Sequence, residues 1–304
     1  TITRKNSSPT AMSFFYGDLY KPVNNIVNAG YTSGKAFKIS TKANPNLRIN
    51  VDGNRRFNKD VNGEVVSGLF SWEQTQAKNN VAYTVSGSLG IDGNVSVSGK
   101  AKNAEGLTLG TAVALATDAN SKDNKGKATL QYQQPSYTVE STVEKKIGDA
   151  VTVDSSVTAK YNNVTVGAQA TFIAYPQPAD KKVIKNYNLG LRYSEKNYTF
   201  AVLAENQLKN IKIGYAQDVD ANLSLALNVD QDLSKPIRPV FTIGNTYKID
   251  NDSAVRAKID NNGALAAAYK FNVNQRLTAT VSASTNVFDQ TKGASTGVLF
   301  EFSA

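Results

Sequence analysis

The feature that most constrains the fold is a two-residue alternation of apolar and polar side chains, which recurs from about residue 35 almost to the end of the chain. In NLRINVD, Leu47, Ile49 and Val51 share one side, and Arg48 and Asn50 share the other. Because successive side chains of a β-strand point to opposite faces, such runs predict strands with one apolar face each. Asn, Asp, Gly, Lys and Pro separate the runs, which is typical of tight turns.

About 19 such runs occur, at a spacing of about 14 residues for each strand with its turn. They lie near residues 35, 46, 65, 80, 93, 106, 126, 136, 149, 162, 183, 196, 208, 219, 237, 252, 263, 275 and 295. A soluble sandwich of about seven to nine strands would fill only about half of the chain, and no linker divides it in two. A closed barrel in lipid gives every apolar face a partner and leaves no open edge. The pattern therefore favours an all-β membrane protein, and a soluble or surface-displayed β-rich binding protein is the alternative.

Composition excludes several other classes. The mean hydropathy is -0.35, and no stretch reaches the roughly 18 apolar residues that a membrane-spanning helix needs. A barrel is compatible with this value, because alternate residues of its strands face a watery lumen. The chain has no Cys and no His, which removes thiol nucleophiles, imidazole bases and the usual zinc ligands. We therefore expect no enzyme activity, no cofactor and no metal site.

Charge points to anionic partners. The chain has 34 Lys and Arg against 25 Asp and Glu, a net charge of +9, which suits anionic metabolites, phosphates, nucleic acid or anionic lipid. The opening TITRKNSSPTAMS has no apolar central region, so it does not predict a secretory signal. This argues against a bacterial outer-membrane or secreted origin.

One segment, SFFYGDLYKPVNNIVNAG, has the spacing of an amphipathic helix of about 13 residues. Its predicted apolar face consists of Phe15, Leu19, Pro22, Val23 and Ile26. Its predicted polar face consists of Asp18, Lys21, Asn24, Asn25 and Asn28. Pro22 lacks an amide N–H and should break or kink the helix, and Gly30 is placed to end it.

Two short motifs have part of the pattern of a ligand site. Asp218, Asp220 and Asn222 have calcium-loop spacing, but the glycine and the glutamate that complete such a loop are missing. GSLGIDG, residues 87–93, matches neither phosphate-binding glycine pattern, and a hairpin turn is the better interpretation.

The polar faces of the strands carry mostly cations. If the apolar set of each strand faces lipid, the cations on the opposite, pore-lining side are Lys38, Arg48, Lys100, Arg192, Lys212, Arg238, Arg256, Lys258 and Arg276. The main acids on that side are Glu140, Glu144 and Asp154. The alternation thus predicts a positively charged inner surface.

Both ends of the chain are similar to one known family. These are YGDLYKPVNNIVNAGYTSGKAFKISTK, residues 16–42, and YKIDNDSAVRAKIDNNGALAAAYKFNVNQRLTATVSAS, residues 247–284, followed by GVLFEFSA. With them the chain resembles the mitochondrial voltage-dependent anion channel, or porin, family over nearly its whole length.

The resemblance implies a roughly 19-stranded transmembrane β-barrel with the N-terminal amphipathic helix inside the pore. It divides the chain into 1–34, the N-terminal extension and pore helix, and 35–304, the barrel. Since the strand number is odd, residues 35–42 should pair in parallel with residues 295–302. The family's place is the mitochondrial outer membrane.

The function that the resemblance implies is a voltage-gated, weakly anion-selective channel for nucleotides, phosphate, organic acids and inorganic ions. Its implied partners are these solutes, membrane lipid and possible further copies or a larger membrane assembly, without nucleic acid. The helix residues Phe15, Asp18, Leu19, Lys21, Pro22, Ile26 and Gly30 would take part in gating.

The chain departs from the family at three places. The family's Gly-Leu-Gly-Tyr run, linked to nucleotide contact, is Ala266, Ala267, Ala268 and Tyr269 here, which argues against a specific nucleotide site. Val85 replaces a lipid-facing glutamate of strand four, and about ten extra residues precede the helix.

The alternative within the same membrane is a protein-import pore. Unfolded presequences are basic, so such a pore should have acidic or apolar patches in its lumen. A lumen rich in Lys and Arg favours the metabolite channel.

Overall fold

The computed structural model describes residues 13–58, 63–116, 124–175, 183–289, 291 and 293–303, and it contains nineteen strands and two short helical segments. The strands of the first half are β1 (Gly34–Asn44), β2 (Leu47–Asn58), β3 (Gly63–Lys78), β4 (Val81–Gly90), β5 (Val95–Asn103), β6 (Leu107–Leu115), β7 (Lys125–Gln133), β8 (Tyr137–Lys146), β9 (Val151–Tyr161) and β10 (Val164–Tyr175). Those of the second half are β11 (Ile184–Ser194), β12 (Tyr198–Glu205), β13 (Asn210–Asp218), β14 (Leu223–Asp232), β15 (Val240–Lys248), β16 (Ser253–Asp260), β17 (Ala264–Asn272), β18 (Leu277–Asn286) and β19 (Ser295–Ser303).

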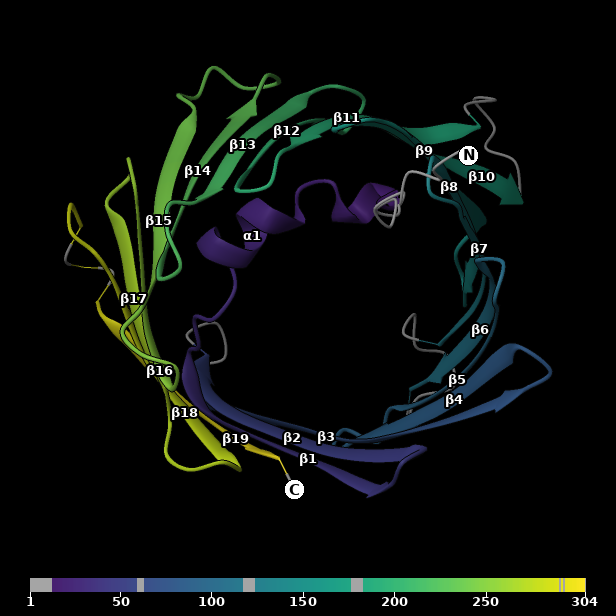
Figure 1. The fold of residues 1–304 in the computed structure, drawn as a ribbon, viewed down its shortest axis with the longest axis horizontal. Helices are drawn as coiled ribbons and strands as arrows, with labels where there is room; N and C mark the ends of the chain where they lie inside the picture. Colours follow the sequence, from purple (N-terminus) through teal and green to yellow (C-terminus); the bar gives the residue numbers. More distant parts are fainter. Residues whose placement is uncertain are drawn as a thin grey trace, which may run out of the picture.

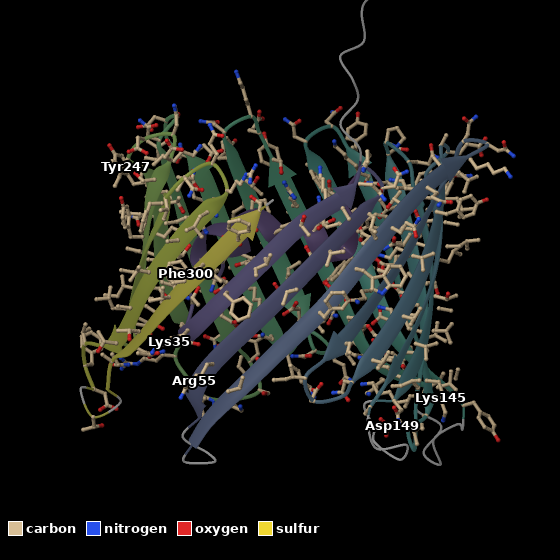
Figure 2. The ribbon with its side chains drawn as sticks, turned by 90° about the horizontal axis from the view of Figure 1, so that it is seen from below. Lys35, Arg55, Lys145, Asp149, Tyr247 and Phe300 are labelled. Atoms are coloured by element: carbon tan, nitrogen blue, oxygen red, sulfur yellow. The ribbon has the colours of Figure 1, made fainter. Side chains whose placement is uncertain are left out.

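The strands form one closed barrel. Each strand pairs with the next in an antiparallel manner, and β1 closes the ring by pairing with β19 in parallel, from Gly34 opposite Gly297 to Ser40 opposite Ser303. Figure 1 shows the ring from its end, and Figure 2 shows the strands tilted against the barrel axis. The predicted all-β barrel and its parallel closure are confirmed. The alternative of two stacked soluble sandwiches is wrong, because a single sheet contains all of the strands.

The two faces of the sheet differ as the alternation predicts. Large apolar side chains such as Phe37, Val97 and Phe300 are about half exposed on the outer face. On the inner face of β4 and β5, the hydroxyls of Ser86 and Ser98 lie 2.7 Å apart. A cross-strand pair on one face of a sheet must point the same way, so the register fixes the facing of every strand.

The N-terminal segment lies inside the ring, along the wall from β9 to β15 (Figure 1). It forms a 3-10 turn, η1 (Tyr16–Asp18), and one short helix, α1 (Lys21–Val27). None of the helices in the described ranges has the length and apolar character to span a membrane. The prediction of one helix of about 13 residues is therefore wrong in its length, although its place inside the barrel is confirmed.

The break between η1 and α1 has a local cause. Tyr20 has φ -100° and ψ 0°, outside the helical region, and Pro22 stands in the first turn of α1, where its missing N–H costs nothing. The helix ends at Val27, and Gly30, with φ +86°, turns the chain toward β1.

The facing assignment generates a first prediction. Val85 points outward from the middle of β4, and its neighbour Ser86 points inward. An arginine on the lipid face near the bilayer midplane costs about 2–4 kcal/mol, whereas the same residue in a watery lumen does not. We expect Val85→Arg to lower the unfolding free energy by that amount, measured by urea titration in lipid vesicles. Ser86→Arg is the matched control, and an equal loss in both variants would contradict the assignment.

Candidate channel lumen and its inner helix

The wall on which the inner segment docks is made of small residues. Gly167, Gly190, Gly214 and Gly244 face inward from β10, β11, β13 and β15. A Cβ atom added at Gly190 would lie 2.6 Å from Leu19 Cδ1, and one added at Gly214 would lie 2.6 Å from the ring of Tyr20. The glycines therefore allow the segment to approach the backbone of the wall.

An apolar core fills the space between the segment and this wall. Leu19 and Val23 are fully buried, and they pack with Tyr16, Tyr20 and Val27 against Ala201, Leu203, Ala216 and Ala226. The predicted apolar face was thus correct for Leu19 and Val23, and Ile26 packs partly buried against the same core, whereas Phe15 is only partly buried before η1. The break at Tyr20 rotates the two pieces relative to each other, so one helical period cannot describe both.

Polar contacts fix the start of the segment. Thr158 and Thr138 donate hydrogen bonds to the carbonyl of Phe14 at 2.6 and 3.3 Å. The side-chain amide of Gln133 donates to the carbonyl of Ser13 at 2.9 Å. These donors come from β7, β8 and β9, so three strands hold the chain before η1 begins.

Arg192 of β11 is the central anchor. Its guanidinium lies 3.8 Å from the centroid of the Phe14 ring and donates a hydrogen bond of 3.1 Å to the carbonyl of Asp18. It also donates to Ser194 Oγ at 2.7 Å. Arg192 is 8% exposed, so this predicted pore-lining cation is covered by the segment that it holds.

The end of the segment is also fixed. Arg256 donates to the carbonyl of Ala29 at 3.0 Å, and the Lys258 ammonium lies 4.7 Å from the ring centroid of Tyr31. The Ser282 hydroxyl donates a hydrogen bond to the carbonyl of Thr32, and it accepts one of 3.1 Å from the Thr32 N–H. The chain is therefore anchored on both sides of α1.

The surroundings of Tyr16 and Tyr20 raise the pKa of their hydroxyls. Burial raises the pKa of Tyr16 and of Tyr20 well above the usual value of 10.0, and the nearby acids Glu205 and Asp230 add to the effect at Tyr20. The Tyr20 hydroxyl donates a hydrogen bond of 2.5 Å to Asn228 Oδ1. The docked state therefore favours the neutral phenols, and this contribution is lost only as the pH rises above 10.0.

The structure places most of the predicted cations on the inner wall. By strand register, Lys38, Arg48, Lys100, Arg192, Lys212, Arg256 and Lys258 point inward, and Arg238 lines the lumen from the β14–β15 loop. Arg276 instead lies in the turn between β17 and β18, outside the strands. Further inward cations that the sequence analysis missed are Lys42, Lys102, Lys125, Lys127, Lys146, Lys160, Lys248 and Lys270.

The wall also carries more acids than the sequence analysis expected. Glu140, Glu144 and Asp154 face inward as predicted, and Glu205, Asp230 and Asp232 join them. These six residues, which we call the acidic crescent, line a chamber of about 1000 Å³ between β8, β9, β12, β14 and the inner segment. Asp52, Glu73, Asp218, Asp260 and Glu301 also point inward. Applying strand parity to acids as to cations would have found them.

The two short motifs are turns. The Asp220 carboxylate accepts the N–H groups of Asn222 and Leu223 at 2.7 and 2.8 Å, and these hydrogen bonds hold its pKa below the usual range. Gly90 to Gly93 form the β4–β5 hairpin turn, with Gly93 at φ +81°. In both motifs the aspartate carboxylates accept hydrogen bonds from residues of the same turn.

An apolar outer face around a polar, charged interior defines the class of transmembrane β-barrel pores. Comparison with known proteins agrees: the pattern of the eukaryotic porin family matches residues 14–297. The chain belongs to that family.

The named relatives are distant in sequence. The mitochondrial outer membrane protein porin of Neurospora crassa is 22% identical over 291 residues, which cover 94% of this chain and 98% of that protein. Porin 5 of Oryza sativa is 27% identical over 161 residues, or 52% of this chain and 55% of that protein. The chain thus spans about half the length of the rice relative.

A solved triple mutant of the Rhodopseudomonas blastica porin is 9% identical, with a TM-score of 0.46 over 78% of this chain and 90% of that one. The protein resides, like its named relatives, in the mitochondrial outer membrane.

A second prediction concerns the docking of the inner segment. Leu19 is fully buried against glycine-lined wall, so Leu19→Ala removes apolar contacts and leaves a cavity, at a cost of about 2–5 kcal/mol. We expect faster amide hydrogen exchange over residues 16–27, measured by mass spectrometry, with unchanged exchange in the strands. Asn25→Ala, at an exposed position of the same helix, should leave the exchange as it is.

Proposed function

We propose that this protein is a voltage-gated, weakly anion-selective channel that passes small anionic metabolites, such as nucleotides, phosphate and organic acids, and inorganic ions. The observation that carries the proposal is the inner wall, on which, among the residues that the structure describes, cationic side chains are more numerous than acidic ones. The porin family supports a channel over an enzyme. A pore of this kind needs no cofactor, because the wall charges act on the solute directly.

The basis of selectivity is the summed potential of the wall. A wide, water-filled pore does not strip ions of their hydration shells, so wall charges act on hydrated ions within about one Debye length, about 10 Å at 0.1 M salt. Arg48, Lys100 and Lys102 lie on β2 and β5, away from the acidic crescent. They make this side of the lumen favourable for anions. The crescent has the opposite effect, so the net preference is weak.

A third prediction tests the sign of the wall. Reversing Arg48, Lys100 and Lys102 to Glu should move the zero-current potential in asymmetric KCl toward cation preference, and the wild-type preference for chloride should fade as salt rises. In the part of the chain that the structure describes, no hydrogen bond, ion pair or ring contact joins these three side chains to the inner segment. The reversals should therefore leave the segment docked on the wall.

The controls for selectivity lie on the outer face. Val51→Leu and Val255→Leu face lipid and should leave the potential unchanged. A wild-type pore that prefers potassium, or a triple variant with an unaltered potential, would refute the proposed anion selectivity.

Gating is proposed to depend on the inner segment. It is held by side-chain contacts at its two ends and by an apolar core, and it contains no strand pairing, so it can leave the wall without breaking the barrel. A charge that crosses the full field gains about 2.3 kcal/mol per 100 mV. That energy is comparable to the few kcal/mol that an apolar docking contact of this size provides. We therefore assign gating roles to Phe15, Asp18, Leu19, Lys21, Pro22, Ile26 and Gly30 as parts of this segment.

A fourth prediction locks the segment in place. A Cβ atom added at Gly244 would lie 3.5 Å from the Cα of Val27, which suits a disulfide. The chain has no cysteine of its own, so Val27→Cys with Gly244→Cys forms a single defined crosslink. Oxidation should abolish voltage-dependent closure in planar-bilayer recordings, and reduction should restore it.

The single variant Val27→Cys is the control for the crosslink and should gate normally under both conditions. Closure that persists in the oxidised double variant would rule out undocking of α1 as the gate.

The acidic crescent favours a second candidate function, a pore for basic presequences. Its six carboxylates face the chamber beside the inner segment, opposed by the three cations Lys127, Lys212 and Arg238, so a net negative charge remains to attract a cationic peptide. A fifth prediction separates the two functions: under the metabolite-channel proposal, a basic amphipathic peptide of presequence type should not block the current at micromolar concentration. Block that disappears in a variant with Glu205, Asp230 and Asp232 changed to Asn or Gln would favour the import pore.

A further inference from the structure

A groove of about 610 Å³ lies on the outer face of the barrel, across β1 to β4 beside the β1–β19 seam. Its floor contains Gly53 and Gly68, which are directly opposite each other on β2 and β3 and face lipid. The ring of Phe37 lies over Gly53, and the side chain of Ile91 lies over Gly68, since an added Cβ would meet them at 2.2 and 2.9 Å. The two adjacent glycines thus allow Phe37 and Ile91 to lie close against the sheet, and the groove runs along these side chains.

The walls of the groove are apolar. They are formed mainly by Phe37, Val66, Phe70, Leu89, Ile91 and Phe300. Each of these side chains is at least 44% exposed, so the surface is open toward the membrane. A narrow apolar hollow of this kind fits a flexible hydrocarbon chain better than a flat surface does.

Two cations stand at one end of the groove. Lys35 and Arg55 are directly opposite each other on β1 and β2, on the outward-facing side. Figure 2 shows both labels on the lower part of the barrel, with Phe300 nearer its middle. A cation on the lipid face is costly at the midplane and costs only about 0–1 kcal/mol near the interface, so this pair marks the headgroup level. Both side chains therefore contribute positive charge at this end of the groove.

We propose that the groove binds one anionic glycerophospholipid, with an acyl chain along its apolar side chains and the phosphate at Lys35 and Arg55. A zwitterionic lipid would bring an ammonium group toward the two cations, which weakens its binding. A second copy of the chain, related by a two-fold axis through the groove, would place like charges against each other. Inorganic phosphate has no apolar part to occupy the floor.

The position of the only tryptophan makes the proposal testable. Trp72 faces outward on β3, two residues from Phe70 and therefore about 7 Å along the strand. Brominated acyl chains quench tryptophan fluorescence on close approach. The full-length protein would be refolded into phosphatidylcholine vesicles at a fixed bromine content, carried by either phosphatidylglycerol or phosphatidylcholine. We expect an apparent preference for brominated phosphatidylglycerol on the order of tenfold.

Three variants separate the parts of the site. Lys35→Gln with Arg55→Gln should reduce the preference to about one, and the single variant Lys35→Gln should give an intermediate value. Val66→Phe fills the groove without changing charge and should weaken quenching by both lipids. Lys145→Gln removes an outward cation elsewhere on the same rim (Figure 2) and should change nothing. Far-UV circular dichroism confirms that each variant folds.

Several results would overturn the proposal. Equal quenching by the two lipids in the wild type would exclude selection of an anionic headgroup. A preference that survives in Lys35→Gln with Arg55→Gln, or that Lys145→Gln removes equally, would assign the effect to the overall charge of the rim. Shielding of Trp72 from both lipids that grows with protein density would show that a second copy occupies the groove.

Discussion

The structure depends on one constraint: in lipid, every backbone N–H and C=O must be hydrogen-bonded within the protein. An open sheet of nineteen strands would expose two edges, and the parallel pairing of β1 with β19 removes both. Because the strand count is odd, no antiparallel closure is available without adding or losing a strand. The register of the seam then fixes which side chains face lipid on the neighbouring strands, and through the antiparallel ladder it fixes the facing of all the others. Charge placement and helix docking follow from this facing.

The same facing explains why an inner segment of so few helical turns is stable. A helix of seven residues is too short to persist in water, so it must gain its stability from contacts with the wall. Glycine at positions 190 and 214 would weaken a strand elsewhere, yet on the inner face it permits contact with Leu19 and Tyr20. Arg192 completes the docking by binding a carbonyl that the 3-10 turn leaves free. The wall therefore has two kinds of inner surface, one small and apolar under the segment and one charged around the open lumen.

The sequence predicts the barrel well, because alternation is a local property that the strands keep. The run near residue 46 is β2 from Leu47, and the run near residue 252 is β16 from Ser253. The inner segment is less predictable, since its buried face depends on a wall assembled from the strands β9 to β15. Tyr16 and Tyr20 were missed because a tyrosine is apolar in its ring and polar at its hydroxyl, and only the position of Asn228 shows how the Tyr20 hydroxyl is satisfied. The placement of Arg238 in a loop over the lumen is likewise a tertiary property.

The distribution of charge connects the wall to the proposed function. Acids gather on β8, β9, β12 and β14 beside the docked segment, whereas β2 and β5 on the other side of the ring present Arg48, Lys100 and Lys102 (Figure 1). At physiological salt the Debye length is about 8 Å, so an ion near one side is influenced mainly by the charges of that side. In the proposed channel, anions and cations would then have separate favourable paths through one lumen, and the difference between the paths would set the selectivity. The inner segment borders the acidic crescent and also the wall cations Arg192, Arg256 and Lys258. In the proposed channel its displacement would therefore expose charges of both signs, which links gating to selectivity through position alone.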